Sequence, residues 1–170
     1  RLKYLNLAFN QLSGNIPNSI GNLVSLEEVR LFQNELSGYI PQELGNLNAL
    51  THVNFRNNNL SGTIPASIGN LNSLEILYLH NNNLNGYIPS EIFGLTNLKR
   101  LFLHNNQLSG TLEEHISDLI SLDRFRIEYN DMSGVISQNI CNLDLQWADS
   151  ISFNISNNMF CEPYPFCVQG

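Results

Sequence analysis

The sequence predicts an α/β solenoid, a stack of about seven coils of 24 residues, and three observations lead to this fold class. Leucine and asparagine both recur with a period of 24 residues along most of the chain. Apolar and polar residues also alternate over a short stretch of each unit, which predicts a strand with one buried face. The leucines that begin the units are Leu2, Leu26, Leu50, Leu74, Leu98 and Leu122.

The strand of each coil is clearest in residues 26–31, "LEEVRL", where Val29 and Leu31 alternate with Arg30 and Phe32. One such strand per coil predicts a parallel sheet. An asparagine follows each strand, and its amide is expected to bond the backbone of the turn and of the next coil. These asparagines are Asn10, Asn34, Asn58, Asn82, Asn106, Asn130 and, after an insertion of about four residues, Asn158.

Each unit reads L-x-x-L-x-L-x-x-N-x-L-S-G-x-I-P-x-x-I-G-N-L-x-x, which resembles the plant-type leucine-rich repeat. Residues 26–49 and 50–73 are nearly complete matches. The resemblance implies a right-handed superhelix with a parallel β-sheet on its concave face and short helical turns on its convex face. It further implies a short second strand at "LSGxIP" and a likeness to extracellular domains of plant receptors and inhibitors.

The chain divides into two parts on this pattern. Residues 1–145 hold six repeats and residues 146–170 hold an irregular coil with a cap rich in Cys and Pro, which is similar to the terminal coil of leucine-rich repeat proteins of algae and marine bacteria. No N-terminal cap precedes the first repeat, so we expect its apolar side chains to face outward and the chain to be part of a longer protein. Those side chains are Leu2, Leu5, Leu7, Leu12, Ile16 and Ile20.

Repeats five and six depart from the pattern because "LSGTLEEHIS" and "MSGVISQNI" lack the proline. In the fifth repeat, Leu112 and Glu113 stand where Ile and Pro are expected. The pattern therefore supports the second strand less clearly near the C-terminal end. Trp147 and Phe153 are expected to close the last layer of the core.

The three cysteines predict one disulfide. Cys161 and Cys167 can close a small loop, and such a bond would indicate an extracellular compartment; the alternative is two free thiols on a stiff tail. Cys141 stands where other repeats have glycine, and a buried free thiol is preferred there over a disulfide. Two sequons, at Asn59 and Asn154, are candidates for N-glycosylation and fit a secreted protein.

Composition excludes several functions. A net charge of −7 argues against a nucleic-acid partner, and no apolar run reaches the roughly 18 residues of a membrane helix. Sequence motifs of metalloproteases, hydrolases and nucleotide-binding enzymes are absent, so neither an enzyme nor a cofactor is expected.

Function is expected where the repeats differ, on the exposed strand positions of the concave sheet. Seven of the eight Lys and Arg residues fall on these positions, against five of the fifteen acidic residues. Aromatic residues among arginines are typical of a recognition surface rather than of an ordinary polar sheet. The predicted binding residues are Arg30, Phe32, Arg56, Tyr78, His80, Arg100, Phe102, His104 and Arg126.

The sequence thus predicts non-catalytic recognition of a protein, a peptide or an anionic polysaccharide, outside the cell or at its surface. The alternative is a structural spacer or assembly subunit that uses its ends and edges. His80, His104 and Glu128 share one column and are a zinc ligand set in type, although an open sheet offers no supporting residues and the metal site is the less favoured reading.

Overall fold

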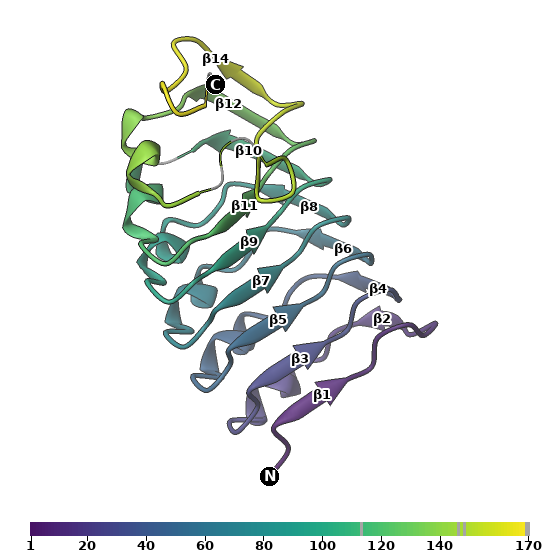
Figure 1. The fold of residues 1–170 in the computed structure, drawn as a ribbon. Helices are drawn as coiled ribbons and strands as arrows, with labels where there is room; N and C mark the ends of the chain where they lie inside the picture. Colours follow the sequence, from purple (N-terminus) through teal and green to yellow (C-terminus); the bar gives the residue numbers. More distant parts are fainter. Residues whose placement is uncertain (113, 146, 148, 169–170) are drawn as a thin grey trace.

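The computed structural model describes residues 1–112, 114–145, 147 and 149–168. In this part of the chain the coils stack side by side, and their strands form two parallel sheets of seven strands each. Each sheet orders its strands as the coils follow one another (Figure 1). The predicted solenoid is therefore confirmed.

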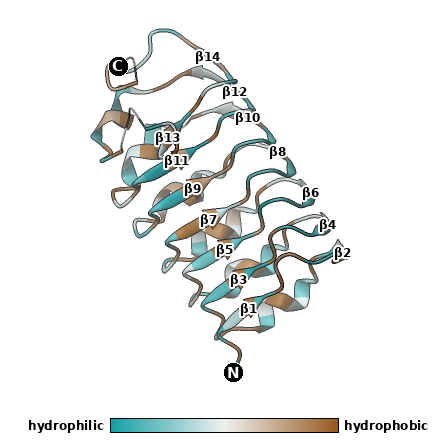
Figure 2. Cartoon of the chain, turned by 45° about the vertical axis from the view of Figure 1, so that its right-hand side comes forward, coloured by the Kyte–Doolittle hydropathy of each residue, from teal (hydrophilic) through white to brown (hydrophobic). Residues whose placement is uncertain are grey.

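The first sheet contains the first strand of every coil. Its strands are β1 (Tyr4–Asn6), β3 (Glu28–Arg30), β5 (His52–Asn54), β7 (Ile76–Tyr78), β9 (Arg100–Phe102), β11 (Arg124–Arg126) and β13 (Phe153–Asn154). The second sheet lies along another side of the coils, as Figure 2 shows. Its strands are β2 (Ser13–Asn15), β4 (Glu35–Gly38), β6 (Asn59–Gly62), β8 (Asn83–Gly86), β10 (Gln107–Thr111), β12 (Asp131–Val135) and β14 (Met159–Cys161).

Short 3-10 helical turns cover the side away from the first sheet. They are η1 (Asn18–Asn22), η2 (Gln42–Asn46), η3 (Ala66–Asn70), η4 (Ser90–Gly94), η5 (Glu114–Asp118) and η6 (Gln138–Asn142). Each of η1 to η4 directly follows a proline whose φ lies near the value that the pyrrolidine ring imposes.

A continuous apolar core runs between the sheets and the turns. Val29, Val53, Leu77 and Leu101 occupy one register position on successive strands and are fully buried. The repeating leucines and isoleucines of the turns pack against them in the same cluster. Since one coil cannot cover its own apolar side, this burial depends on both neighbours.

The asparagine column satisfies the buried backbone of the turns. Asn58 donates from Nδ2 to the carbonyls of Phe55 in its own coil and Leu31 in the preceding one, each at 3.0 Å, and its Oδ1 accepts from the Leu36 amide. Asn34, Asn82, Asn106, Asn130 and Asn158 repeat the pattern. The predicted bonds to the turn are confirmed, but the second partner is the preceding coil rather than the next.

The second strand continues through repeats five and six, where the sequence pattern supported it less clearly. β10 and β12 are five residues long, whereas β4, β6 and β8 are four. The residue directly after the glycine pairs across the sheet there, as Thr111 does with Ser133, and Asn15 pairs with Ser37 in the same way in a repeat that keeps its proline. Glu113 lies outside the described residues.

The first coil is only partly uncovered. Leu2, Leu7 and Leu12 are exposed and Leu5 is half-buried, as the sequence predicts. Ile16 and Ile20, however, are buried, contrary to expectation, because they lie toward the second coil, whose Leu31 and Leu36 border the same apolar hollow.

At the opposite end, aromatic rings close the core as predicted. Phe153 is buried and meets the partly buried Trp147 ring edge-to-face, with centroids 4.7 Å apart. The ring of Phe125 in the preceding coil lies 6.4 Å from that of Phe153, between centroids. None of the helical turns that the structure describes is long and apolar enough to cross a membrane.

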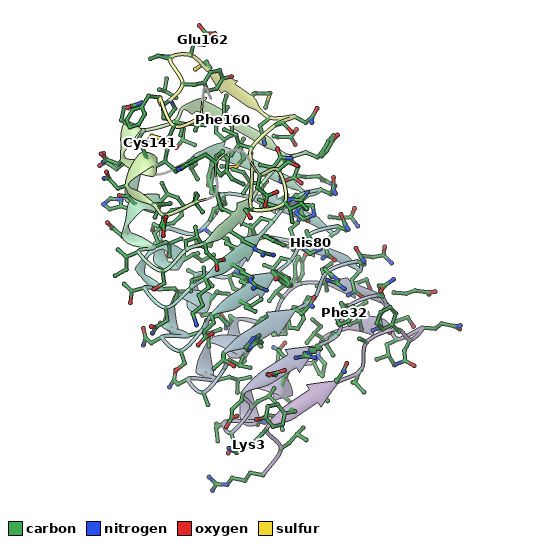
Figure 3. The ribbon with its side chains drawn as sticks, viewed as in Figure 1. Lys3, Phe32, His80, Cys141, Phe160 and Glu162 are labelled. Atoms are coloured by element: carbon green, nitrogen blue, oxygen red, sulfur yellow. A yellow bond between two sulfur atoms is a disulfide. The ribbon has the colours of Figure 1, made fainter. Side chains whose placement is uncertain are left out.

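The disulfide joins Cys141 to Cys167, with Cα atoms 5.7 Å apart, and this corrects both cysteine predictions. Cys161 is instead an exposed free thiol. The reason is that Cys161 is fixed in β14, where it pairs with Val135, while the tail beyond it turns back toward η6. Figure 3 shows Cys141 beside the C-terminal segment.

Candidate binding face on the first sheet

The register of the first sheet places the predicted binding residues in three parallel columns. Arg30, Asn54, Tyr78, Phe102 and Arg126 are direct partners on neighbouring strands. A second column, two residues earlier in each strand, holds His52, Ile76 and Arg100. The column just beyond the strands is held in line by backbone bonds between successive coils. It contains Phe32, Arg56, His80, His104 and Glu128.

Four rings from two adjacent coils form one cluster. Tyr78 and Phe102 stack with centroids 4.7 Å apart and planes 17° from parallel. His80 and His104 stack at 4.2 Å and 15°. Within each coil the two rings meet edge-to-face, at 5.8 Å in one and 5.9 Å in the other. We call Tyr78, His80, Phe102 and His104 the ring cluster; its stacking and edge-to-face contacts position the rings before any ligand arrives.

A second aromatic contact extends this surface toward the N-terminal coils. The guanidinium carbon of Arg56 lies 4.4 Å from the centre of the Phe32 ring, and Phe9 meets that ring edge-to-face at 5.0 Å. Figure 3 shows Phe32 and His80 on the same side of the solenoid. A cation over an aromatic face is held in place, and its outward side remains able to bind an anion.

The arginines differ in how they are paired. Arg30 is bonded to Glu28 at 2.6 Å, and Arg126 is bonded to Glu128. Arg100 lies 4.0 Å from Asp123, and a hydrogen bond with Tyr78 raises the pKa of its guanidinium. Arg100 is therefore a half-buried cation with one distant ion-pair partner, suited to a carboxylate ligand.

Both histidines of the ring cluster are neutral. Burial, with smaller effects from the neighbouring His104, Arg56 and Arg126, lowers the pKa of His80 to about 3. Burial is also the main cause for His104, whose pKa is lowered to about 4 although the nearby Glu128 carboxylate acts in the opposite direction and Arg126 in the same one. The cluster thus presents uncharged rings between arginines at ordinary pH.

His80, His104 and Glu128 do share a column, yet the two imidazoles face each other as a stack and Glu128 is bonded to Arg126. Among the residues that the structure describes, no three His, Cys, Asp or Glu side chains could hold a metal ion. The three predicted zinc ligands are therefore close in space, but their side chains are not arranged to coordinate a metal ion.

Several buried polar atoms of this region have no hydrogen-bond partner among the described residues. They are Nδ1 of His80, Nδ1 of His104, Nε of Arg126 and Oε2 of Glu128. A buried polar group without a partner costs about 1–3 kcal/mol, so these four atoms carry a cost in stability.

A shallow hollow opens beside the ring cluster. It is lined by Arg30, Phe32, His52, Asn54, Ile76, Tyr78 and Arg100. Of these, His52, Asn54 and Ile76 were not among the predicted binding residues. Their place in the same columns was visible in the sequence, but their type gave no signal of recognition.

The two sequons lie in different settings. Asn59 is exposed at the start of β6, whereas Asn154 is half-buried in β13 and its Oδ1 accepts a hydrogen bond from the Ser156 amide at 3.0 Å. Accessibility therefore favours Asn59 as the site for a glycan.

The sequence pattern described as Leucine Rich Repeat matches five successive stretches, residues 1–23, 25–47, 49–71, 73–95 and 97–119. These cover more than half of the chain, which therefore belongs to the leucine-rich repeat family. Comparison with curated protein sequences gives no match.

Among solved structures, the chain is similar to the ectodomain of the plant membrane receptor kinase GASSHO1/SCHENGEN3 from Arabidopsis thaliana, determined in complex with CASPARIAN STRIP INTEGRITY FACTOR 2. The two share 34% identity with a TM-score of 0.87, over 94% of this chain and 19% of that one. The Arabidopsis receptor kinase HAESA ectodomain, in complex with an IDA peptide hormone ligand, gives 29% identity and a TM-score of 0.89, over 98% of this chain and 27% of that one.

A plant ice-binding protein is also similar, with 26% identity and a TM-score of 0.68, over 96% of this chain and 67% of that one. The chain spans less than a third of the two receptor ectodomains. The same fold thus occurs in proteins that differ in what they bind, so function has to be argued from the exposed residues.

Proposed function

We propose that the chain is a non-catalytic recognition module, outside the cell or at its surface, that binds an extended peptide or protein segment along the first sheet. The observation that carries the proposal is the ring cluster between Arg56, Arg100 and Arg126. Two receptor ectodomains with this fold are described in complex with a peptide hormone or a named factor, which supports a peptide ligand.

The chemistry of the surface favours a segment that carries both apolar and acidic side chains. Tyr78 and Phe102 offer stacked faces for an apolar side chain, and Arg100 can pair with a carboxylate. His80 and His104 are only 8% and 7% exposed, so their part is to hold Tyr78 and Phe102 in place through edge-to-face contacts rather than to bond the ligand.

A triple variant, Tyr78→Ala, Arg100→Ala and Phe102→Ala, tests the proposal. A displayed library of random peptides is selected on the wild-type domain, and the affinity of selected peptides is measured for both proteins by calorimetry. We expect selection of peptides that carry an acidic and an aromatic or aliphatic residue, with binding weakened about 100-fold or more in the variant.

Circular dichroism and thermal unfolding first establish that the variant is folded. Arg126 is left unchanged because its loss would leave the buried Glu128 unpaired and destabilise the domain for another reason. Peptides that bind the variant as tightly as the wild type would contradict the proposal. The proposal would also be contradicted if no peptide bound and polygalacturonate did, because the first sheet would then be the binding site of an anionic polysaccharide.

The alternative is a structural spacer. It predicts that no peptide is selected and that cross-links to partners map to the ends and the helical turns. The clustering of rings and arginines on one face favours recognition over this alternative.

A further inference from the structure

The exposed surface of the second sheet carries two tyrosines that the proposed function does not use. Tyr39 and Tyr87 are 71% and 72% exposed, which is unusual for large aromatic side chains on a sheet. They occupy the same position, directly after the glycine, in the second and fourth coils. We call the surface around them the tyrosine face. The residues of their column are Asn15, Tyr39, Thr63, Tyr87, Thr111 and Val135.

Each tyrosine leans on the next coil, where a glycine leaves room for its ring. A Cβ atom added to Gly62 would lie 2.3 Å from Cδ1 of Tyr39, and one added to Gly110 would lie 2.3 Å from Cδ1 of Tyr87. Both glycines also have positive φ, of +74° and +88°. The rings are therefore held at one edge while the rest of each ring meets solvent, so little side-chain entropy is lost on binding.

The spacing of the rings follows from the sheet. Tyr39 and Tyr87 are separated by two coils, and two strand spacings of a sheet amount to about 9.6 Å. Thr63 lies between them and places its Cγ2 against Gly86. In an extended β-1,4-linked polysaccharide every second pyranose presents the same face, and the length of this two-sugar repeat is close to the spacing of the rings.

The tyrosine face is uncharged, unlike the first sheet. Neither the tyrosine column nor the column before the glycines contains an ionisable group other than the two tyrosines; the latter consists of Ser13, Ser37, Ser61, Asn85, Ser109 and Ser133. Acidic residues, Glu35 and Asp131, border the face at its two ends. This arrangement offers hydroxyl and amide groups to sugar hydroxyls and repels an anionic polymer.

We propose that the tyrosine face is a second binding site, for an uncharged, extended β-1,4-linked polysaccharide whose alternate sugars stack on Tyr39 and Tyr87. The site is independent of the ring cluster. A peptide on the first sheet and a glycan on the second can be bound separately, so failure of one proposal leaves the other standing.

Cellohexaose and hydroxyethyl cellulose are the probes, measured by calorimetry and by affinity gel electrophoresis. All proteins carry Asn59→Gln, so that no attached glycan borders the face. We expect binding of both probes by the parent protein and a loss of about tenfold or more in affinity for Tyr39→Ala with Tyr87→Ala. Tyr129→Ala removes an exposed tyrosine from elsewhere and should bind as the parent does.

The sharpest variant keeps both tyrosines and changes only their separation. Thr63→Tyr with Tyr87→Thr moves the rings from two coils apart to one, and Gly86 gives the new ring the same support that Gly62 gives Tyr39. We expect this variant to lose affinity for both probes to the same extent as the double alanine variant. Polygalacturonate should not bind the tyrosine face.

Three results would overturn the inference. They are no binding of either probe by the parent protein, equal binding by the spacing variant, and loss of binding in Tyr78→Ala with Phe102→Ala, which would place the glycan on the first sheet. Retention of glycan binding in that last variant supports two separate sites.

Discussion

The imidazole rings of His80 and His104 stack with their centroids 4.2 Å apart and are almost completely buried, with 8% and 7% of each residue exposed. Arg56 and Arg126 add positive charge around them. Two histidines in this arrangement cannot both accept protons without placing like charges in contact. The ring cluster therefore resists protonation, although exposed histidines titrate near pH 6.5.

Acid should destabilise the domain through this pair. The unfolded chain binds protons near pH 6.5, but the folded protein keeps His80 and His104 neutral until their pKa values of about 3 and about 4. The stabilisation is complete above pH 6.5 and is lost as the pH falls from 6.5 toward 4. Urea unfolding between pH 7 and 5 should show a slope of up to about 1.4 kcal/mol per pH unit for each histidine.

The matched variant for this prediction is His80→Phe with His104→Phe, which keeps the stacked rings and removes the titration. Its free energy of unfolding should vary less with pH over the same range. Parallel pH profiles for the two proteins would show that other groups dominate acid unfolding.

The asparagine column should contribute unequally along the chain. Asn82→Ala removes bonds to the carbonyls of Phe55 and Leu79 and from the amide of Leu60, all in the interior. Leaving these groups unpaired should lower the free energy of unfolding by about 3 kcal/mol or more. Asn10 is exposed and bonds only the carbonyls of Leu7 and Ala8 in its own turn, so Asn10→Ala should cost less than about 1 kcal/mol in the same urea titration. Equal losses of unfolding free energy in the two variants would mean that burial does not determine how much each asparagine stabilises the fold.

Close packing of the helical turns predicts a contrast between two glycines. A Cβ atom on Gly45 would lie 2.3 Å from the carbonyl oxygen of Ser67 in the next coil, whereas one on Gly94 would meet nothing within 4 Å. Gly45→Ala should destabilise by about 1–3 kcal/mol and Gly94→Ala by less than about 0.5 kcal/mol. Thermal unfolding of the two variants checks this, and a tolerated Gly45→Ala would show that the coils can separate slightly at little cost.

The cysteines give a prediction that mass spectrometry can decide. Digestion without reduction should yield a peptide pair that links Cys141 to Cys167, with Cys161 open to alkylation. Because the bond closes a loop across 26 residues, Cys167→Ser should lower stability by about 3 kcal/mol, and Cys161→Ser should have little effect. A linked pair of Cys161 and Cys167 would restore the interpretation drawn from the sequence.

The sequence was sufficient for the architecture because periodicity fixes it. A strict period of 24 residues places Arg30, Asn54 and Tyr78 side by side without knowledge of any contact, and the structure confirms that register. The asparagine column could be foreseen for the same reason. These features depend on spacing alone.

Features that depend on contacts in space were harder to predict. Cys161 and Cys167 are closer in sequence, yet the path of the tail after β14 brings Cys167 to Cys141. The missing proline of repeats five and six lowered the support for a second strand there, yet β10 and β12 pair through residues that precede the proline position. The neutrality of His80 and His104 likewise follows from burial that no single repeat reveals.

The disulfide between Cys141 and Cys167 makes the two ends of the solenoid unequal in stability. Coils of a solenoid contact only their neighbours, so such a stack loses order one layer at a time from whichever end is looser. One end is fastened covalently across η6 and the tail, while the first coil is held by noncovalent contacts alone. In residues 1–170 taken alone, fraying should therefore advance from the first coil toward the last, and hydrogen exchange should slow in steps along the chain before it reaches the layer that the disulfide joins.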